Sequence, residues 1–304
     1  MSTSAPPVSV AAPTTVGAAA TRVKKRRTSP WASIAAITIA IIWTIPTLGL
    51  LVTSFRPQTD INTSGWWTVL SNPTFTLDNY RQVLDTSSGG SSIVTYFVNS
   101  IVITIPAVVI PISLACLAAY GLAWINFRGR GWIFIAIFAL QIVPIQVTLI
   151  PLLSLYVDAG LAGTFWTIWI SHSIFGLPLA IFLLHNFMRE VPKELIEAAR
   201  VDGAGHVKIF FSVVLPLLTP AIAAFGIFQF LWVWNDLLVA LTFAGGSPDV
   251  APMTVFLANL SGTRGTAWFL LSAGAFVSII VPVVVFIALQ RYFVRGLLAG
   301  SVKG

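Results

Sequence analysis

One stretch between apolar runs, ELIEAARVDGAGHVKIFFSVVLPLL from Glu194 to Leu218, carries acids and bases close together: Glu194, Glu197, Arg200, Asp202 and Lys208. Pro192 stands at a plausible first helical position and Gly203 is a natural stop, so the spacing predicts a short helix between them. Its charged side chains should stay in water, with Glu197 and Arg200 as a possible (i, i+3) pair. A short charged helix of this kind can contact a partner through ion pairs and hydrogen bonds.

The same helix carries a narrow apolar stripe. Leu195 and Ala199 lie four residues apart with Ile196 alongside, and Ala198 keeps one side of the helix thin. A helix this short is only marginally stable alone in water. Its thin face suits docking into a groove of another protein. An amphipathic helix lying on a membrane surface fits the residue pattern equally well, so both alternatives stay open at this point.

A second group of polar residues lies inside an apolar run. Asp236 is the only acid in such a run, and Asn235, Gln229 and Trp232 are close to it in sequence. Polar groups at this depth usually face a cavity or the interior of a helix bundle. Aromatic rings beside hydrogen-bonding groups suit a sugar. The alternatives are a Trp at the membrane interface, a local cap at Asp236 and hydrogen bonds between helices.

Composition places these residues in a membrane protein. The chain is 57% hydrophobic and 9% charged, whereas a soluble protein carries about 25% charged residues. The formal charge of +7 comes from short basic clusters that flank the apolar runs, which argues against nucleic acid as a partner. We find no metal-ligand or catalytic motif of the H-E-x-x-H or G-x-S-x-G type, and no phosphate-binding G-x-x-x-x-G-K-[ST]. These absences exclude a membrane-embedded enzyme of those classes and an ATPase.

Six apolar runs are long enough to cross a bilayer, so we expect an all-α polytopic membrane protein. The predicted spans are Trp31–Phe55, Ile93–Ile125, Trp132–Tyr156, Thr164–Phe187, Phe210–Thr242 and Trp268–Phe293. Proline occurs inside or at the ends of most of them, which indicates a kinked bundle. The transmembrane domain would cover residues 31–293, preceded by a disordered basic tail over 1–30 and followed by a tail over 294–304.

The distribution of Lys and Arg predicts the orientation. With the N-terminus inside, fourteen Lys and Arg residues fall on cytoplasmic segments and three, Arg56, Arg81 and Arg264, fall outside. The positive-inside rule therefore places both termini in the cytoplasm. It also places the loop 188–209, with the charged helix, on the cytoplasmic side.

The charged stretch resembles the EAA loop of ABC importer permeases. The match is Glu197-Ala198-Ala199, three residues, Gly203, nine residues, Val213, one residue, and Leu215-Pro216. Only Val213 departs, conservatively, from the usual Ile. The resemblance implies the type I ABC importer permease fold, with this loop as the coupling helix that seats in a cytoplasmic ATPase subunit. The residues implied at or beside that contact are Glu194, Glu197, Ala198, Ala199, Arg200, Asp202 and Gly203, with Leu215 and Pro216 beginning the helix that moves.

The resemblance also implies partners and a location. These are a second homologous permease, two ATP-binding subunits that hold ATP and Mg, and an extracytoplasmic solute-binding protein, in the cytoplasmic (inner) membrane of a bacterium. No cofactor would be bound by this chain. The C-terminal tail would be a further candidate for the ATPase interface.

Three further segments are similar to the carbohydrate, maltose-type branch of these permeases: NPTFTLDNYRQVL, WNDLLVAL and LQRYFVRGLLAGSVKG. The segment LANLSGTRGTAWFLLSAGAFVS leans toward α-glucoside permeases. By resemblance the substrate is therefore a maltose-type or α-glucoside-type sugar. A non-sugar solute, such as a glycerophosphodiester or a polyamine, is the alternative substrate. A secondary transporter is disfavoured, because the chain has one intramembrane acid and no evident repeat.

Overall fold

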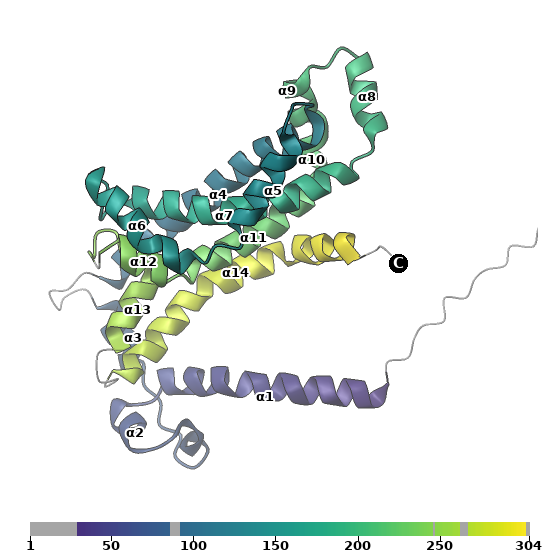
Figure 1. Cartoon of the computed structure of the whole chain (residues 1–304). Coiled ribbons are helices and arrows are strands. Elements are labelled where there is room, and N and C mark those ends of the chain that lie inside the picture. The colour runs from purple at the N-terminus through teal and green to yellow at the C-terminus, as the bar shows by residue number, and fades with distance from the viewer. Residues whose placement is uncertain (1–28, 86–91, 246, 262–266, 302–304) are drawn as a thin grey trace, which may run out of the picture. The chain divides into compact units, whose positions relative to one another are not determined.

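The computed structural model describes residues 29–85, 92–245, 247–261 and 267–301, with backbone alone at 261 and 291–301. Every regular element in these ranges is helical (Figure 1). The long helices are α1 (Pro30–Ser54), α4 (Ile93–Trp124), α7 (Phe165–Glu190), α11 (Thr219–Trp234) and α14 (Trp268–Ser301). The shorter ones are α2 (Gln58–Thr63), α3 (Asp78–Leu84), α5 (Arg130–Leu140), α6 (Ile145–Asp158), α8 (Lys193–Val201), α9 (His206–Ile209), α10 (Leu215–Leu217), α12 (Leu238–Phe243) and α13 (Met253–Ser261). A 3₁₀ turn at Trp66–Leu70 and a π turn at Phe210–Val214 complete the set.

The chain divides into two compact units, residues 1–47 and residues 48–304. The tail predicted over 1–30 falls almost wholly outside the described residues. At the other end α14 continues as a helix past the predicted boundary at Phe293 to Ser301. Nearly all the elements that concern function belong to the second unit.

The described helices include four that are long and apolar enough to cross a membrane, and up to six spans if each of two bent pairs counts as one. The four lie at Pro30–Ser54, Ile93–Trp124, Phe165–Glu190 and Trp268–Gln290, close to four of the predicted spans. The other two predicted spans, Trp132–Tyr156 and Phe210–Thr242, each contain a sharp bend between helices, in keeping with the kinked bundle that the prolines predict.

The first break separates α5 from α6, whose axes differ by 97°. Helix α5 ends at Leu140, and Pro144 follows with an extended backbone, φ −62° and ψ 130°. A proline disfavours helical backbone at the residue before it, here Val143, and it lacks the N–H that a continuing helix needs. The residues 141–144 therefore form a corner within a run that hydropathy alone reads as one span.

The second break lies at the entrance to the fifth span. The segment His206–Leu217 and helix α11 differ in direction by 71°. Pro216 and Pro220 each remove a backbone donor, and the proline ring clashes with the carbonyl of the residue four positions earlier. The π turn Phe210–Val214 lies just before Pro216. Because π turns and prolines are both common causes of sharp bends, the two together account for the change of direction here.

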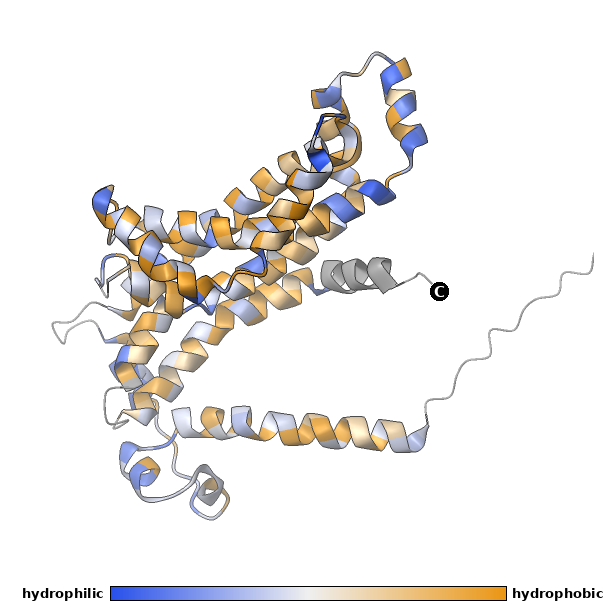
Figure 2. Ribbon diagram, viewed as in Figure 1, coloured by the Kyte–Doolittle hydropathy of each residue, from blue (hydrophilic) through white to orange (hydrophobic). Residues whose placement is uncertain are grey.

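The core of the second unit is built on α4 and α7, which pack along most of their lengths, with α11 against α4 and α14. Helices α8 and α9 lie at one end of this bundle, and α6, α12 and α13 lie toward the other (Figure 1). Hydrophobic residues follow the long helices, whereas hydrophilic residues gather at α8 and the end of α7 (Figure 2). The small residues Ala115, Ala119 and Ala180 are fully buried and allow α4 and α7 to approach closely.

The segment after α1 folds around a buried arginine. Arg56 is 2% exposed and donates from Nη1 and Nη2 to the carbonyl oxygens of Asp60, Ser64 and Gly65 and to the hydroxyls of Ser64 and Thr68. Asn79 of α3 in turn donates to the carbonyls of Ser54 and Arg56. The positive charge of Arg56 thus organises this segment.

Candidate functional site: the α8–α9 corner and the α11–α12 break

Helix α8 is anchored through one side chain. Ile196 is 2% exposed and belongs to a buried cluster with Ala119 of α4, Leu184 of α7 and Ile209 of α9. Of the predicted stripe of Leu195, Ile196 and Ala199, Leu195 is 45% exposed, so Ile196 is the centre of the packed face. Ala199 is half-buried against the same cluster. Helix α8 therefore contacts the bundle through one narrow face, centred on Ile196 with Ala199 beside it.

The other faces of α8 are open. The predicted contact residues Glu194, Glu197, Ala198, Arg200, Asp202 and Gly203 are all exposed. Glu197 and Arg200, both among the described residues, do not form the possible ion pair, whereas Asp78 and Arg81 do, at 3.1 Å. Both charges remain available to a partner. Val201, 87% exposed, adds an apolar contact at the same end.

Gly203 closes α8 with a defined geometry. Its φ is +78°, in the left-handed region. The N–H of Gly203 donates to the carbonyl of Arg200 at 2.9 Å, and the N–H of Ala204 donates to the carbonyl of Ala199 at 2.9 Å. This pair of bonds is the Schellman motif, which satisfies the last carbonyls of a helix and favours glycine at the left-handed position. The spacing between Ala199 and Gly203 is thus the spacing that this helix end requires.

A hydrogen bond that the sequence analysis missed ties the corner to α4. Tyr120 Oη lies 3.0 Å from His206 Nδ1 and donates to the His206 carbonyl at 3.3 Å. The two rings also meet edge to face, with centroids 6.0 Å apart. The residues are 86 positions apart, so no local pattern could have paired them. His206 begins α9, and the corner between α8 and α9 is therefore held at both ends.

Leu215 and Pro216 lie in α10, at the bend before α11. Leu215 is half-buried against the same cluster as Ile196, and Pro216 is exposed. The neighbours Val214 and Leu218 are the buried anchors of this turn, at 0% and 2% exposure. The Leu-Pro pair thus marks the point at which the chain from the corner turns into the fifth span.

Asp236 lies in the break between α11 and α12. Its carboxylate accepts hydrogen bonds from the backbone N–H of Val239 at 3.3 Å and of Ala240 at 3.0 Å, which caps α12. Its Oδ2 also lies 3.7 Å from Nε2 of His172, and both side chains are buried, 8% and 1% exposed. Thr254 Oγ1 donates to the Asp236 carbonyl. In this conformation the Asp236 carboxylate caps α12, which was one of the alternatives that the sequence allowed.

The other predicted path residues differ in exposure. Asn235 is exposed, and its amide donates to the Leu231 carbonyl at 2.7 Å. Trp232 is half-buried and meets His172 edge to face, with centroids 5.1 Å apart. Gln229 is fully buried, and its Nε2 donates to the carbonyls of Ala107 at 3.1 Å and His172 at 3.3 Å. These side chains all lie in one region of α11 near α7. They do not line a single solvent-accessible surface, because their exposure ranges from buried to exposed.

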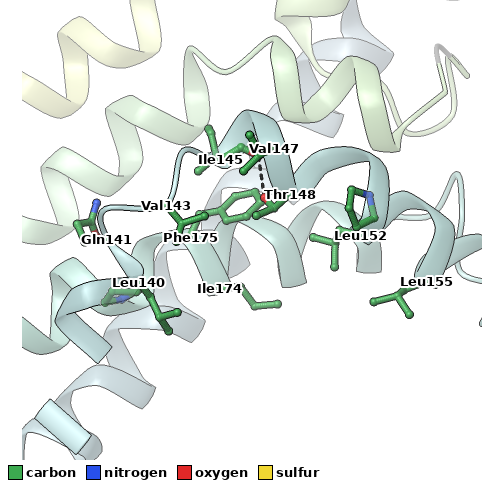
Figure 3. Close-up of a pocket in the computed structure, with 12 residues that line it drawn as sticks. Leu140, Gln141, Val143, Ile145, Val147, Thr148, Leu152, Leu155, Ile174 and Phe175 are labelled. Carbon is green, nitrogen blue, oxygen red and sulfur yellow. Dashed lines mark hydrogen bonds between the residues drawn. The ribbon is translucent and has the colours of Figure 1, made fainter. Parts of the chain in front are cut away.

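A cavity of about 370 Å³ lies at the α5–α6 break (Figure 3). Gln141 comes from the break itself, Val147, Thr148 and Leu152 from α6, and Phe175 from α7. The hydroxyl proton of Thr148 is already used within α6, because it donates to the Ile145 carbonyl at 2.7 Å. A smaller cavity of about 230 Å³ shares Gln141 and Phe175 and reaches Gln229 and Trp232. Within the described residues there is no group of three or more His, Cys, Asp or Glu that could hold a metal.

Comparison with known proteins identifies the family. Residues 111–298 match the binding-protein-dependent transport system inner membrane component family, and this match covers more than half of the chain. The chain belongs to this family. It is a transport permease and not an enzyme, and it is an integral, multi-pass membrane protein. The matched residues include the α5–α6, α10–α11 and α11–α12 breaks and the whole of the α8–α9 corner.

Individual permeases are similar over most of their length. The chain is 54% identical over 286 residues to the osmoprotective compounds uptake permease protein GgtD of Synechocystis sp., covering 91% of this chain and 95% of that one. It is 51% identical over 244 residues to the alpha-glucoside transport system permease protein AglG of Rhizobium meliloti, covering 79% and 63%. The arabinooligosaccharides transport system permease protein AraQ of Halalkalibacterium halodurans is 34% identical, covering 92% and 100%.

The fold of this permease is also known from a solved structure. A bacterial ABC transporter involved in the import of the acidic polysaccharide alginate contains a chain that superimposes with a TM-score of 0.69, at 21% identity, covering 88% of this chain and 99% of that one. The expected ABC importer permease fold is therefore confirmed.

Proposed function

We propose that this permease forms half of the translocation path of an ATP-driven importer for a carbohydrate of the maltose or α-glucoside type. Supporting this substrate class are the relatives named for α-glucoside and arabinooligosaccharide transport. The observation that carries the mechanism is α8, which exposes Glu197 and Ala198 while Ile196 anchors it in the bundle. A helix held in this way can receive a force from outside and pass it inward.

The coupling runs from a partner ATPase through α8. ATP and Mg belong to that partner, and this chain binds neither. When the ATPases close, the seated α8 is displaced. Ile196 passes the displacement to α4 and α7, and the Tyr120–His206 bond passes it to α9 and hence to α11. The bends of 97° and 71° are the points at which the two broken spans change direction, so the bundle can alternate between inward and outward access there.

The proposed sugar path follows α11. Asn235 and Trp232 are available in the present conformation, since one is exposed and the other half-buried. The Asp236 carboxylate is engaged in the cap of α12 and becomes available if the α11–α12 break opens. Gln229 is fully buried beside the smaller cavity, with its Nε2 engaged and its Oε1 unpaired among the described residues. In this proposal the sugar first contacts the Asn235 amide and the Trp232 indole. It contacts Asp236 and Gln229 later.

The assembly we propose contains a second homologous permease, two ATP-binding subunits and an extracytoplasmic sugar-binding protein. It lies in the bacterial cytoplasmic membrane with both termini of this chain inside. One solved structural relative is a bacterial alginate ABC transporter in complex with a pentasaccharide-bound periplasmic protein, which supports the last of these partners.

Import of an osmoprotective compound is the second candidate, because the permease named for that class is 54% identical. The two candidates separate in proteoliposomes that contain the complete importer, ATP inside and binding protein outside. The carbohydrate proposal expects maltose, an α-glucoside that is not a typical osmoprotectant, to stimulate ATP hydrolysis and radiolabelled maltose to accumulate. Stimulation by a zwitterionic osmolyte such as glycine betaine, with no response to any α-glucoside, would overturn it.

A further inference from the structure

A basic pocket opens beside the start of α8, separate from the bends at α5–α6 and α10–α11. It has a volume of about 340 Å³ and lies where the end of α4, the start of α5 and the end of α7 meet. Its charged lining residues are Arg130, Arg189 and Lys193, and no acid is among the described residues that line it. Three cations therefore share one small space.

Local contacts satisfy only part of this charge. Arg130 donates from Nη1 to Asn126 Oδ1 at 2.7 Å, and within the described residues its other guanidinium donors remain open to a ligand. Arg130 and Arg189 come from different helices, α5 and α7, and line the same pocket, with His185 between them in the lining. Like charges brought together in this way repel one another unless an anion lies between them.

Two buried groups in the pocket wall lack a partner. Trp124 Nε1 and His185 Nδ1 are both buried, and neither forms a hydrogen bond within the described part of the chain. His185 as a whole is 7% exposed. An indole N–H can only donate, and a buried donor without an acceptor costs about 1–3 kcal/mol. Trp124 and His185 both line the pocket, so a ligand oxygen that reached the indole N–H would remove this cost.

The position of the pocket favours a lipid. The helices α4 and α7 end there, and both are long enough to span a membrane. Leu122 and Phe134 form an apolar side of the lining, and Trp132 on α5 is 78% exposed, as aromatic residues at membrane interfaces often are. A free phosphate would use the cations and leave the apolar side uncovered. A phospholipid would use both.

We propose that this pocket binds the phosphate headgroup of an anionic phospholipid. Arg130, Arg189 and Lys193 pair with the phosphate and the Trp124 indole donates to one of its oxygens, while the acyl chains lie along the apolar side. Basic pockets between membrane helices are known to hold such headgroups. Lys193 is the first residue of α8, so the bound lipid would touch the helix that meets the ATPase.

Native mass spectrometry of the full-length permease in detergent tests this proposal. Phosphatidylglycerol, phosphatidylcholine and inorganic phosphate are titrated separately. We expect one phosphatidylglycerol to bind at least tenfold more tightly than phosphatidylcholine. Arg189→Gln and Arg130→Gln should each weaken it about fivefold, the contribution of one cation near an anionic lipid. Arg128→Gln is the matched control, because Arg128 is exposed nearby and does not line the pocket.

Arg189→Lys keeps the charge, so this variant should bind phosphatidylglycerol nearly as tightly as the wild type does. It shows whether a loss at Arg189→Gln comes from the missing charge or from a misfolded protein. Three results would overturn the proposal. The first is equal binding of the two lipids. The second is a loss at Arg128→Gln as large as that at Arg189→Gln, which would indicate general surface attraction. The third is displacement of phosphatidylglycerol by millimolar inorganic phosphate, which would make the site a free-anion site.

Discussion

Replacing Gly203 with alanine isolates the contribution of the α8 corner to coupling. An added Cβ at Gly203 meets no atom within 4 Å, so no steric clash is expected. The entire cost comes from the backbone, since φ is +78° and an L-residue pays about 1–2 kcal/mol for left-handed geometry. That energy shifts the local equilibrium between the closed and frayed helix end by roughly 5- to 30-fold. Gly203→Asn should cost less, because asparagine tolerates this region.

Gly205 supplies a matched control two residues away. Its φ is −75° and an added Cβ there also meets nothing within 4 Å. Gly205→Ala should therefore leave the corner intact. Hydrogen exchange of the reconstituted permease reads the effect at the Gly203 and Ala204 amides, which donate to Arg200 and Ala199. We expect exchange about 5- to 30-fold faster in Gly203→Ala, with a parallel fall in sugar-stimulated ATP hydrolysis. Indistinguishable exchange in the two alanine variants would refute this reasoning.

Three further changes test other parts of the account. Glu197→Lys reverses an exposed charge on α8, so we expect loss of ATPase binding in a pull-down without a change in the melting temperature of the permease; unchanged binding would argue against the contact. Tyr120→Phe removes the 3.0 Å hydrogen bond to His206, which should cost about 1 kcal/mol of stability. We expect the complex to assemble but coupled ATP hydrolysis to fall several-fold. Coupling at the wild-type level would show that this bond does not transmit the movement of α8. Asp236→Ala removes the cap of α12 and should lower thermal stability by about 0.5–2 kcal/mol, with Asp236→Asn retaining most of it; equal melting of both variants and the wild type would contradict the capping role.

The parts of the fold that depend on local signals could be predicted from the sequence. The bounds of α8, predicted between Pro192 and Gly203, agree with Lys193–Val201 because proline and glycine act within one turn of where they stand. Four long apolar runs gave the bounds of α1, α4, α7 and the start of α14 to within a few residues. Hydropathy over some 20 residues decides such spans.

The breaks and the long-range contacts could not be predicted in the same way. A hydropathy window reads the run around Pro144 as one span, although its two halves turn by 97°. Pro106 and Pro111 lie inside α4 without ending it, so proline alone does not locate a break. The burial of Ile196 in place of Leu195 depends on how α8 is aimed at the bundle, which neighbouring residues do not encode. The same holds for Tyr120 and His206.

Cross-linking from α8 tests the central claim most directly. Cys116 is the single cysteine of the chain and is 4% exposed, so a cysteine introduced at the exposed Ala198 can be modified selectively. In the assembled importer we predict that Ala198→Cys with a short bifunctional reagent forms a product with the ATP-binding subunit, at a yield that changes when ATP is added. The absence of any such product, in a complex that still imports sugar at the expense of ATP, would contradict the account.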